Sequence, residues 1–308
     1  MGEARRKKEG RTSFLARHPC CCYCGGATPA TTLDHVPSRQ MFALRRRPKG
    51  LEVPACEACN RATRHHEQVA AMLGRFYPDS DDAAEQHEMR RIMEAVSRNV
   101  PGLLEGMQPS AGQQLRFIRS GVRPPGLGGA LNCNGPLLNE AIQKFGAKLG
   151  FALHYHLTGR IVPRAGGVAV RWYTNYDAMT RGIPSSLFRI LGEPETLRQG
   201  RWSVSDQFAY AYAIKTGSST GAYFSTFRRS FAVLSWVCED RARLGDAAES
   251  RKPLAGRRGA GTRPSRPTHT PLASAGGDPK HAVLPLPSRP CGPRQPRIPP
   301  SAAAFSHR

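Results

Sequence analysis

Two pairs of cysteines with the same internal spacing place the strongest constraint on how this chain folds. The pairs are Cys21-x-x-Cys24 and Cys56-x-x-Cys59. A tetrahedral zinc ion takes four thiolates, and two C-x-x-C turns separated by a few tens of residues supply them. Gly25 follows the first pair, which suits a tight turn that needs a positive φ. We therefore predict a structural Zn²⁺ site made by these four cysteines.

Other uses of the cysteines stay open at the level of sequence. Cys20 and Cys22 flank Cys21, so a binding register through either of them is an alternative. Disulfides are less favoured, because the chain opens with MGEARRKKEGR and shows no apolar secretion signal. We expect a cytoplasmic protein with reduced thiols. Three further cysteines stand alone and are interpreted as core or tail residues: Cys133, Cys238 and Cys291.

The segment between the two pairs carries an Asp34-His35 dipeptide followed by Val36 and Pro37. Adjacent side chains on a strand point to opposite faces unless the strand bends there, and Pro37 favours a bend. The second pair runs directly into Asn60, and apolar residues continue at helical spacing as far as Phe76. The pattern predicts a hairpin, a loop and then a helix.

The ordered motifs resemble the HNH endonuclease superfamily, whose ββα-metal site is often built on a four-cysteine treble-clef zinc. The likeness is carried by C-C-Y-C-G at 21–25, L-D-H-V-P at 33–37 and L-E-V-P-A-C-E-A-C-N at 51–60. These motifs cover about a sixth of the chain, and their order and spacing are more specific than any one of them.

The resemblance implies a metal-dependent endonuclease that hydrolyses phosphodiester bonds, in DNA most readily. His35 would be the general base that takes a proton from water, a task that suits a neutral imidazole near pH 7. Asp34 and Asn60 would hold a divalent metal, Mg²⁺ or Mn²⁺, because carboxylate and amide oxygens suit a hard ion.

Three positions depart from the family pattern, and one is the last motif position, which is often histidine and here is Asn60. The middle asparagine, which props the histidine loop, has no counterpart, because Lys49-Gly50-Leu51 occupies that stretch. A lysine that commonly follows the last motif is replaced by Thr63. On a continuous helix Arg64 would lie about 40° from Asn60 and would reach the same phosphate. The neighbouring histidines, His65 and His66, fall on other faces and are interpreted as surface residues.

Charge also favours a nucleic-acid partner. The formal net charge is +22, but residues 241–308 hold 13 Lys and Arg against 3 Asp and Glu, so much of the excess lies in the tail. A basic run in the loop between the two motifs lies close to the predicted site. The predicted phosphate-binding residues are Arg45, Arg46, Arg47, Arg61 and Arg64.

The remaining pattern predicts an α+β fold: a small zinc-bound treble-clef ββα-metal module, then helices and a predominantly antiparallel β-sheet. Helices are expected from Asp82 to about Ser97 and from Pro136 onward. Strands are expected at 168–173, 208–214 and 231–237. The aromatic residues of these strands are interpreted as core rather than as surfaces that stack on bases.

Composition divides the chain into five segments. They are a basic N-terminal arm (1–19), the zinc module (20–78), a helix and linker (79–130) that includes a Gly/Pro-rich loop at 124–129, an α+β domain of unknown role (131–242) and a disordered basic tail (243–308). No stretch has the apolar length of a membrane span, so no membrane partner is expected.

Two other functions stay open. The module could be a catalytically inactive, zinc-stabilised nucleic-acid-binding module, as the missing asparagine allows. Alternatively, residues 21–76 could be a structural zinc clip, with the sheet domain mediating protein contacts. The sequence leaves the oligomeric state undetermined.

Overall fold

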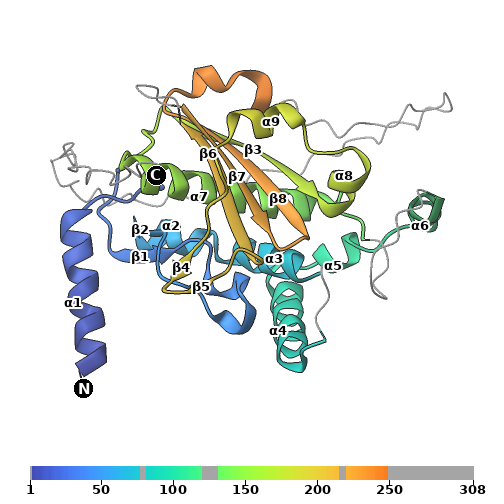
Figure 1. Cartoon of the computed structure of the whole chain (residues 1–308), viewed down its shortest axis with the longest axis horizontal. Helices are drawn as coiled ribbons and strands as arrows, with labels where there is room; N and C mark the ends of the chain where they lie inside the picture. The colour runs from blue at the N-terminus through green and yellow to red at the C-terminus, as the bar shows by residue number, and fades with distance from the viewer. Residues whose placement is uncertain (1, 77–80, 120–130, 215–219, 249–308) are drawn as a thin grey trace, which may run out of the picture.

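A computed structural model describes residues 2–76, 81–119, 131–214 and 220–248. The expected linker loop at 124–129 and the tail beyond residue 248 lie outside the described residues. Within the described part the protein is an α+β structure built on a four-stranded antiparallel sheet (Figure 1).

The sheet has the strand order β3-β8-β7-β6. Its strands are β3 (Gly167–Thr174), β6 (Phe208–Ile214), β7 (Thr220–Phe227) and β8 (Phe231–Cys238). The long helix α7 (Pro136–Thr158) covers one face, and α9 (Ser185–Ile190) packs on the other by placing Leu187 near Phe224. This arrangement leaves α7 between the sheet and the N-terminal part of the chain.

The cysteine-containing segment forms a hairpin followed by two helices. Strands β1 (Thr32–His35) and β2 (Glu52–Ala55) pair antiparallel, with His35 opposite Glu52. The loop between them contains two 3-10 turns, η1 (Arg39–Met41) and η2 (Ala43–Arg45). Helices α2 (Glu57–Ala62) and α3 (Arg64–Arg75) follow, and Thr63 separates them.

The remaining helices, strands and 3-10 turn complete the described structure. They are α1 (Gly2–Arg17), α4 (Ala83–Asn99), α5 (Leu103–Gly106), α6 (Ala111–Arg119), α8 (Asn175–Thr180), β4 (Arg198–Gln199), β5 (Trp202–Ser203) and η3 (Arg241–Ala248). No helix in the described ranges is both long and apolar enough to cross a membrane.

The expected antiparallel sheet is confirmed, and local signals mark several boundaries. Asp82 caps α4, because its carboxylate accepts a hydrogen bond from the amide of Ala84 at 2.7 Å. Pro136 stands in the first turn of α7. Strand β7 was not expected, since its residues Thr220–Phe227 mix small and polar side chains with aromatic ones.

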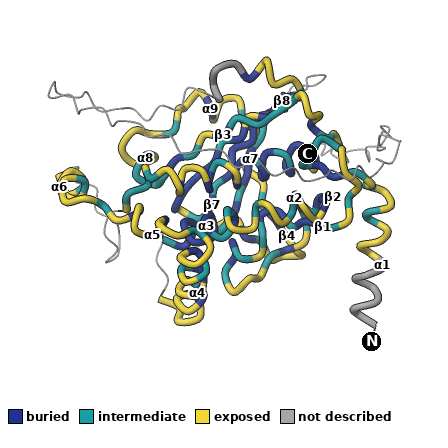
Figure 2. The backbone as a smooth tube through the Cα atoms, turned by 180° about the vertical axis from the view of Figure 1, so that it is seen from behind, coloured by how far each residue is buried: buried dark blue, intermediate teal, exposed yellow. Residues whose placement is uncertain are grey.

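One hydrophobic core joins the segments that composition separated. Val53 of β2, Met72 of α3, Phe145 of α7 and Tyr223 of β7 belong to a single cluster of buried residues. Figure 2 shows buried backbone running from the hairpin through α3 and α7 into the sheet. The hairpin segment and the sheet are therefore packed as one body.

Candidate metal centre and histidine site

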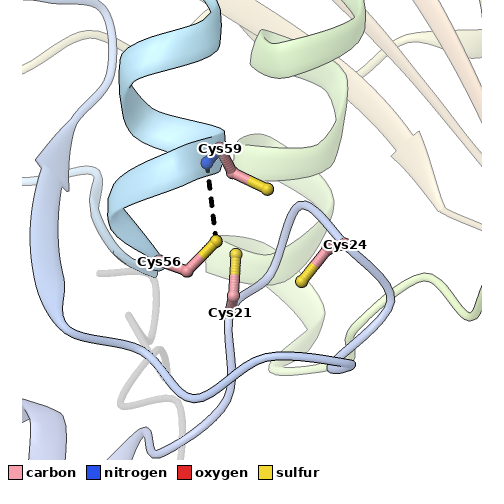
Figure 3. A group of neighbouring side chains, drawn as sticks. All are labelled: Cys21, Cys24, Cys56 and Cys59. Atoms are coloured by element: carbon pink, nitrogen blue, oxygen red, sulfur yellow. Dashed lines mark hydrogen bonds between the residues drawn. The ribbon is translucent and has the colours of Figure 1, made fainter. Parts of the chain in front are cut away.

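The four cysteines of the two C-x-x-C pairs come together beside the hairpin (Figure 3). Their sulfur atoms all lie within 4.8 Å of one another. Cys21 and Cys24 come from the turn before β1, whereas Cys56 is the N-cap of α2 and Cys59 lies within that helix. The spacing and the thiol chemistry fit a metal such as zinc, held by these four residues.

The close packing of the four thiols disfavours negative charge at Cys59. Burial, followed by the neighbouring thiols, raises the pKa of Cys59. Four thiols this close lose their protons together when a cation lies between them, because the metal offsets their mutual repulsion. Cys22 is not part of this group and is buried in the main core, so the four-cysteine cluster uses the expected register.

Asp34 is buried in a network of polar side chains. It is 6 % exposed, and its Oδ2 accepts a hydrogen bond from the hydroxyl of Tyr23 at 2.8 Å. The same oxygen lies 2.7 Å from Nζ of Lys148, which reaches across from α7. That ammonium also forms an ion pair with Glu67 of α3. The carboxylate therefore already has a cation against it.

His35 lies on the other side of the strand and has a different partner. Its Nδ1 lies 3.4 Å from Oε1 of Glu52, the residue opposite it in the β1–β2 register. The His35 side chain is 35 % exposed, and its buried Nδ1 makes no hydrogen bond of normal geometry, so Glu52 lies beside it as a charged neighbour. The Glu52 carboxylate therefore faces the Nδ1 side of the imidazole ring.

Glu52 is the neighbour of His35 that the sequence did not reveal. Burial alone would raise the pKa of its carboxyl, but His35, Arg47 and the amide of Gly50 together lower that pKa to about 2. Glu52 is thus ionised across the neutral pH range. Its place opposite His35 follows from the hairpin register, which could have been found only by pairing the two strands correctly.

Asn60 has a third, separate set of contacts. Its side-chain amide donates a hydrogen bond to Oγ1 of Thr32 at 3.3 Å, and that hydroxyl in turn donates to the carbonyl of Ala55 at 2.9 Å. Thr32 and Asp34 share one face of β1 and His35 faces the opposite way, because side chains alternate along a strand. Asp34, His35 and Asn60 therefore each contact different partners.

Arg47 corrects one expectation about the basic loop. It was expected to contact phosphate, but its side chain is 2 % exposed. The guanidinium donates to the backbone carbonyls of Pro37 at 2.8 Å, Val36 at 2.9 Å and Gly50 at 2.5 Å. It braces the loop that follows His35, where the family pattern places an asparagine. A run of three arginines cannot indicate which one turns inward.

The other four arginines that were expected to bind phosphate are exposed, and two of them form ion pairs. Arg45 forms an ion pair with Glu88 at 2.7 Å, and Arg61 forms one with Glu57 along α2. Arg46 and Arg64 are also exposed. The interruption at Thr63 places Arg64 at the start of a second helix, so the 40° relation to Asn60 that a continuous helix would give does not hold.

Comparisons with protein-family models, with curated proteins and with solved structures gave no match for this chain. The likeness to HNH enzymes therefore depends on the motifs and on the cluster of four cysteines, which fits such a fold without identifying it.

Proposed function

We propose that this chain is an HNH-type endonuclease that hydrolyses phosphodiester bonds, in DNA most readily. The observation that carries the proposal is the pairing of His35 with Glu52 on a hairpin held next to the four-cysteine cluster. A general base needs a histidine whose second nitrogen is held by an acceptor, and Glu52 is placed to be that acceptor.

In the proposed reaction His35 takes a proton from water through Nε2 as the water oxygen attacks phosphorus, and Glu52 stabilises the imidazolium that forms. The bond from phosphorus to the 3′ oxygen breaks, and the departing 3′ oxygen takes up a proton from solvent. The ionised carboxylate at 3.4 Å from Nδ1 supplies the compensating charge. Exposed Arg46 and Arg64 are the candidates for holding the phosphate, since guanidinium groups bind phosphate oxygens in pairs. The structural zinc, held by the four cysteines, would fix the hairpin and take no part in the hydrolysis.

The catalytic Mg²⁺ or Mn²⁺ that the resemblance implies does not fit the arrangement of Asp34 and Asn60. Oδ2 of Asp34 already accepts from Tyr23 and faces the ammonium of Lys148. The carboxylate is 6 % exposed, and the amide of Asn60 is bonded to Thr32. We therefore derive no step through a divalent ion at these residues.

A plasmid-nicking assay tests the proposal. Purified zinc-loaded protein is incubated with supercoiled plasmid in Mg²⁺, in Mn²⁺ and in neither. We expect nicking by the wild type, loss of nicking by at least about 100-fold in His35→Ala and a smaller loss in Glu52→Gln. His65→Ala is the matched control, because His65 is an exposed histidine of α3. Equal nicking by the wild type and His35→Ala would exclude His35 as the base.

A second candidate is a zinc-stabilised module that binds nucleic acid and does not cut it. The ion pair between Lys148 and Asp34 favours this function, because it engages the carboxylate that the family uses for catalysis. Under this function the plasmid is retarded in a gel by the wild type and by His35→Ala alike, and neither protein nicks it. The retardation should weaken steeply as salt rises, since phosphate contacts release counterions.

A further inference from the structure

A buried ammonium occupies the centre of the polar network behind the hairpin. Lys148, Asp34 and Glu67 are 4 %, 6 % and 8 % exposed, respectively. They come from three elements, α7, β1 and α3, which meet between the sheet and the hairpin. A lysine is rarely buried to this extent unless its charge is balanced by carboxylates, and here two carboxylates contact one nitrogen.

The positive charge of Lys148 holds the carboxylates of Asp34 and Glu67 close together. Burial alone would lower the pKa of Lys148, but Glu67 and Asp34 raise it, so the group is a cation at neutral pH. The Tyr23 hydroxyl adds a hydrogen bond to Asp34, and the Tyr23 ring lies 5.6 Å from the ammonium. Without Lys148, two carboxylates would face one small buried volume with no cation between them, which is strongly unfavourable.

We propose that the ammonium of Lys148 is the resident cation of the Asp34 site, and that a divalent ion binds there only when this ammonium is removed. Asp34 and Glu67 both contact the same nitrogen, so their oxygens are close enough to be ligands of one ion. Carboxylate oxygens are the ligands that Mg²⁺, Mn²⁺ and Ca²⁺ take. Lys148 therefore closes a two-carboxylate site that would otherwise accept such an ion.

Binding of Mn²⁺ to the zinc-loaded full chain, followed by electron paramagnetic resonance, tests the proposal. We expect the wild type and Asp34→Asn to bind Mn²⁺ equally weakly, because Asp34 is not available in either protein. Lys148→Ala should bind Mn²⁺ at least about tenfold more tightly, a gain that the double variant Asp34→Asn with Lys148→Ala loses. Lys144→Ala is the matched control, because Lys144 lies one turn earlier in α7, exposed and paired with Glu140.

Two results would overturn the proposal. One is Mn²⁺ binding by the wild type that disappears in Asp34→Asn, which would mean that the ammonium does not exclude the ion. The other is a folded Lys148→Ala that binds Mn²⁺ no more tightly than the wild type. Lys148→Met retains the length of the side chain without its charge and replaces Lys148→Ala if the latter does not fold. The Mn²⁺ measurement does not depend on cleavage. The proposal for Lys148 can therefore be wrong while the nuclease proposal is right, and the nuclease proposal can be wrong while the proposal for Lys148 is right.

Discussion

Arg47 organises the segment that connects the two strands of the hairpin. Its guanidinium donates to five backbone carbonyls, two in the turn after His35 and three in the stretch before β2. Each bond joins a charged donor to a carbonyl in a nearly dry environment. Arg47 thereby holds both ends of the loop together and sets the position of Glu52 relative to His35.

Replacing Arg47 by Met should lower the free energy of unfolding by at least about 2 kcal/mol, because five carbonyls lose a charged donor. Urea denaturation followed by tryptophan fluorescence measures the change. Arg46→Met is the control, since Arg46 is the exposed neighbour, and it should stay within about 0.5 kcal/mol of the wild type. Similar values for both variants would mean that the Arg47 contacts do not stabilise the loop.

Glu52 makes stability depend on pH in the acidic range. Its pKa in the folded protein is about 2, below the ordinary value of 4.5, so it stabilises the fold fully above pH 4.5. This contribution is lost as the pH falls from 4.5 towards 2. Glu52→Gln should therefore cost up to about 3 kcal/mol at pH 7 and progressively less below pH 4.5.

Unfolding free energies of the wild type and Glu52→Gln between pH 2.5 and pH 7 give this difference directly. Acid would also release a metal from the four-cysteine cluster, but that effect is common to both proteins and cancels in the comparison. Glu57→Gln, at an exposed glutamate of α2, should differ little from the wild type at every pH. A difference for Glu52→Gln that stays constant down to pH 2.5 would contradict the assigned pKa.

Among the elements, α7 connects the sheet with the hairpin. Glycines on its inner face allow it to lie close to the strands. A Cβ atom at Gly146 would lie 2.5 Å from Cγ1 of Val170 and 2.8 Å from Cγ1 of Val233. Lys148, two residues later, lies on the opposite side of α7, which faces the hairpin, and there it reaches Asp34 on β1.

Gly146→Ala should lower stability by about 1 to 3 kcal/mol, because the added methyl group overpacks the contact between α7 and the sheet. Helix propensity alone predicts the opposite effect. Alanine favours a helix more than glycine does, so the free energy of unfolding would rise by up to about 1 kcal/mol. Gly112→Ala in α6 isolates that propensity effect, since nothing lies within 4 Å of a Cβ there, and it should stabilise. Thermal denaturation of the two variants tests this: the midpoint temperature should fall for Gly146→Ala and rise for Gly112→Ala.

At the scale of the whole molecule, one core joins the cysteine cluster to the sheet. The buried residues of β2, α3, α7 and β7 form a single cluster, so the hairpin cannot lose its packing without exposing part of α7. A metal that binds the folded cluster and not the unfolded chain stabilises everything that unfolds with it.

We therefore expect a single unfolding transition that includes zinc release. All three tryptophans, Trp172, Trp202 and Trp236, lie outside residues 20–78, so their fluorescence reports on the sheet side. A zinc indicator dye reports on the four cysteines. The two signals should coincide along a urea gradient, and a chelator under reducing conditions should lower the midpoint of both. Zinc release that clearly precedes the fluorescence change would show two independent units.

The sequence by itself determined the features that depend on short-range chemistry. The spacing of Cys21, Cys24, Cys56 and Cys59 predicted their cluster. Each C-x-x-C turn holds two thiols close together, and two such turns can surround one metal ion. The cap at Asp82 and the start of α7 at Pro136 followed from the local needs of helix ends.

Only the tertiary structure decided which charges meet. Lys148 is 114 residues from Asp34 along the chain, and it reaches Asp34 because α7 packs against α3 and the hairpin. Arg47 turns inward while Arg46 beside it stays exposed, which three identical letters cannot distinguish. Burial and pairing depend on contacts between elements, so the cation at Asp34, the partner of His35 and the brace of the loop could not be predicted from local patterns.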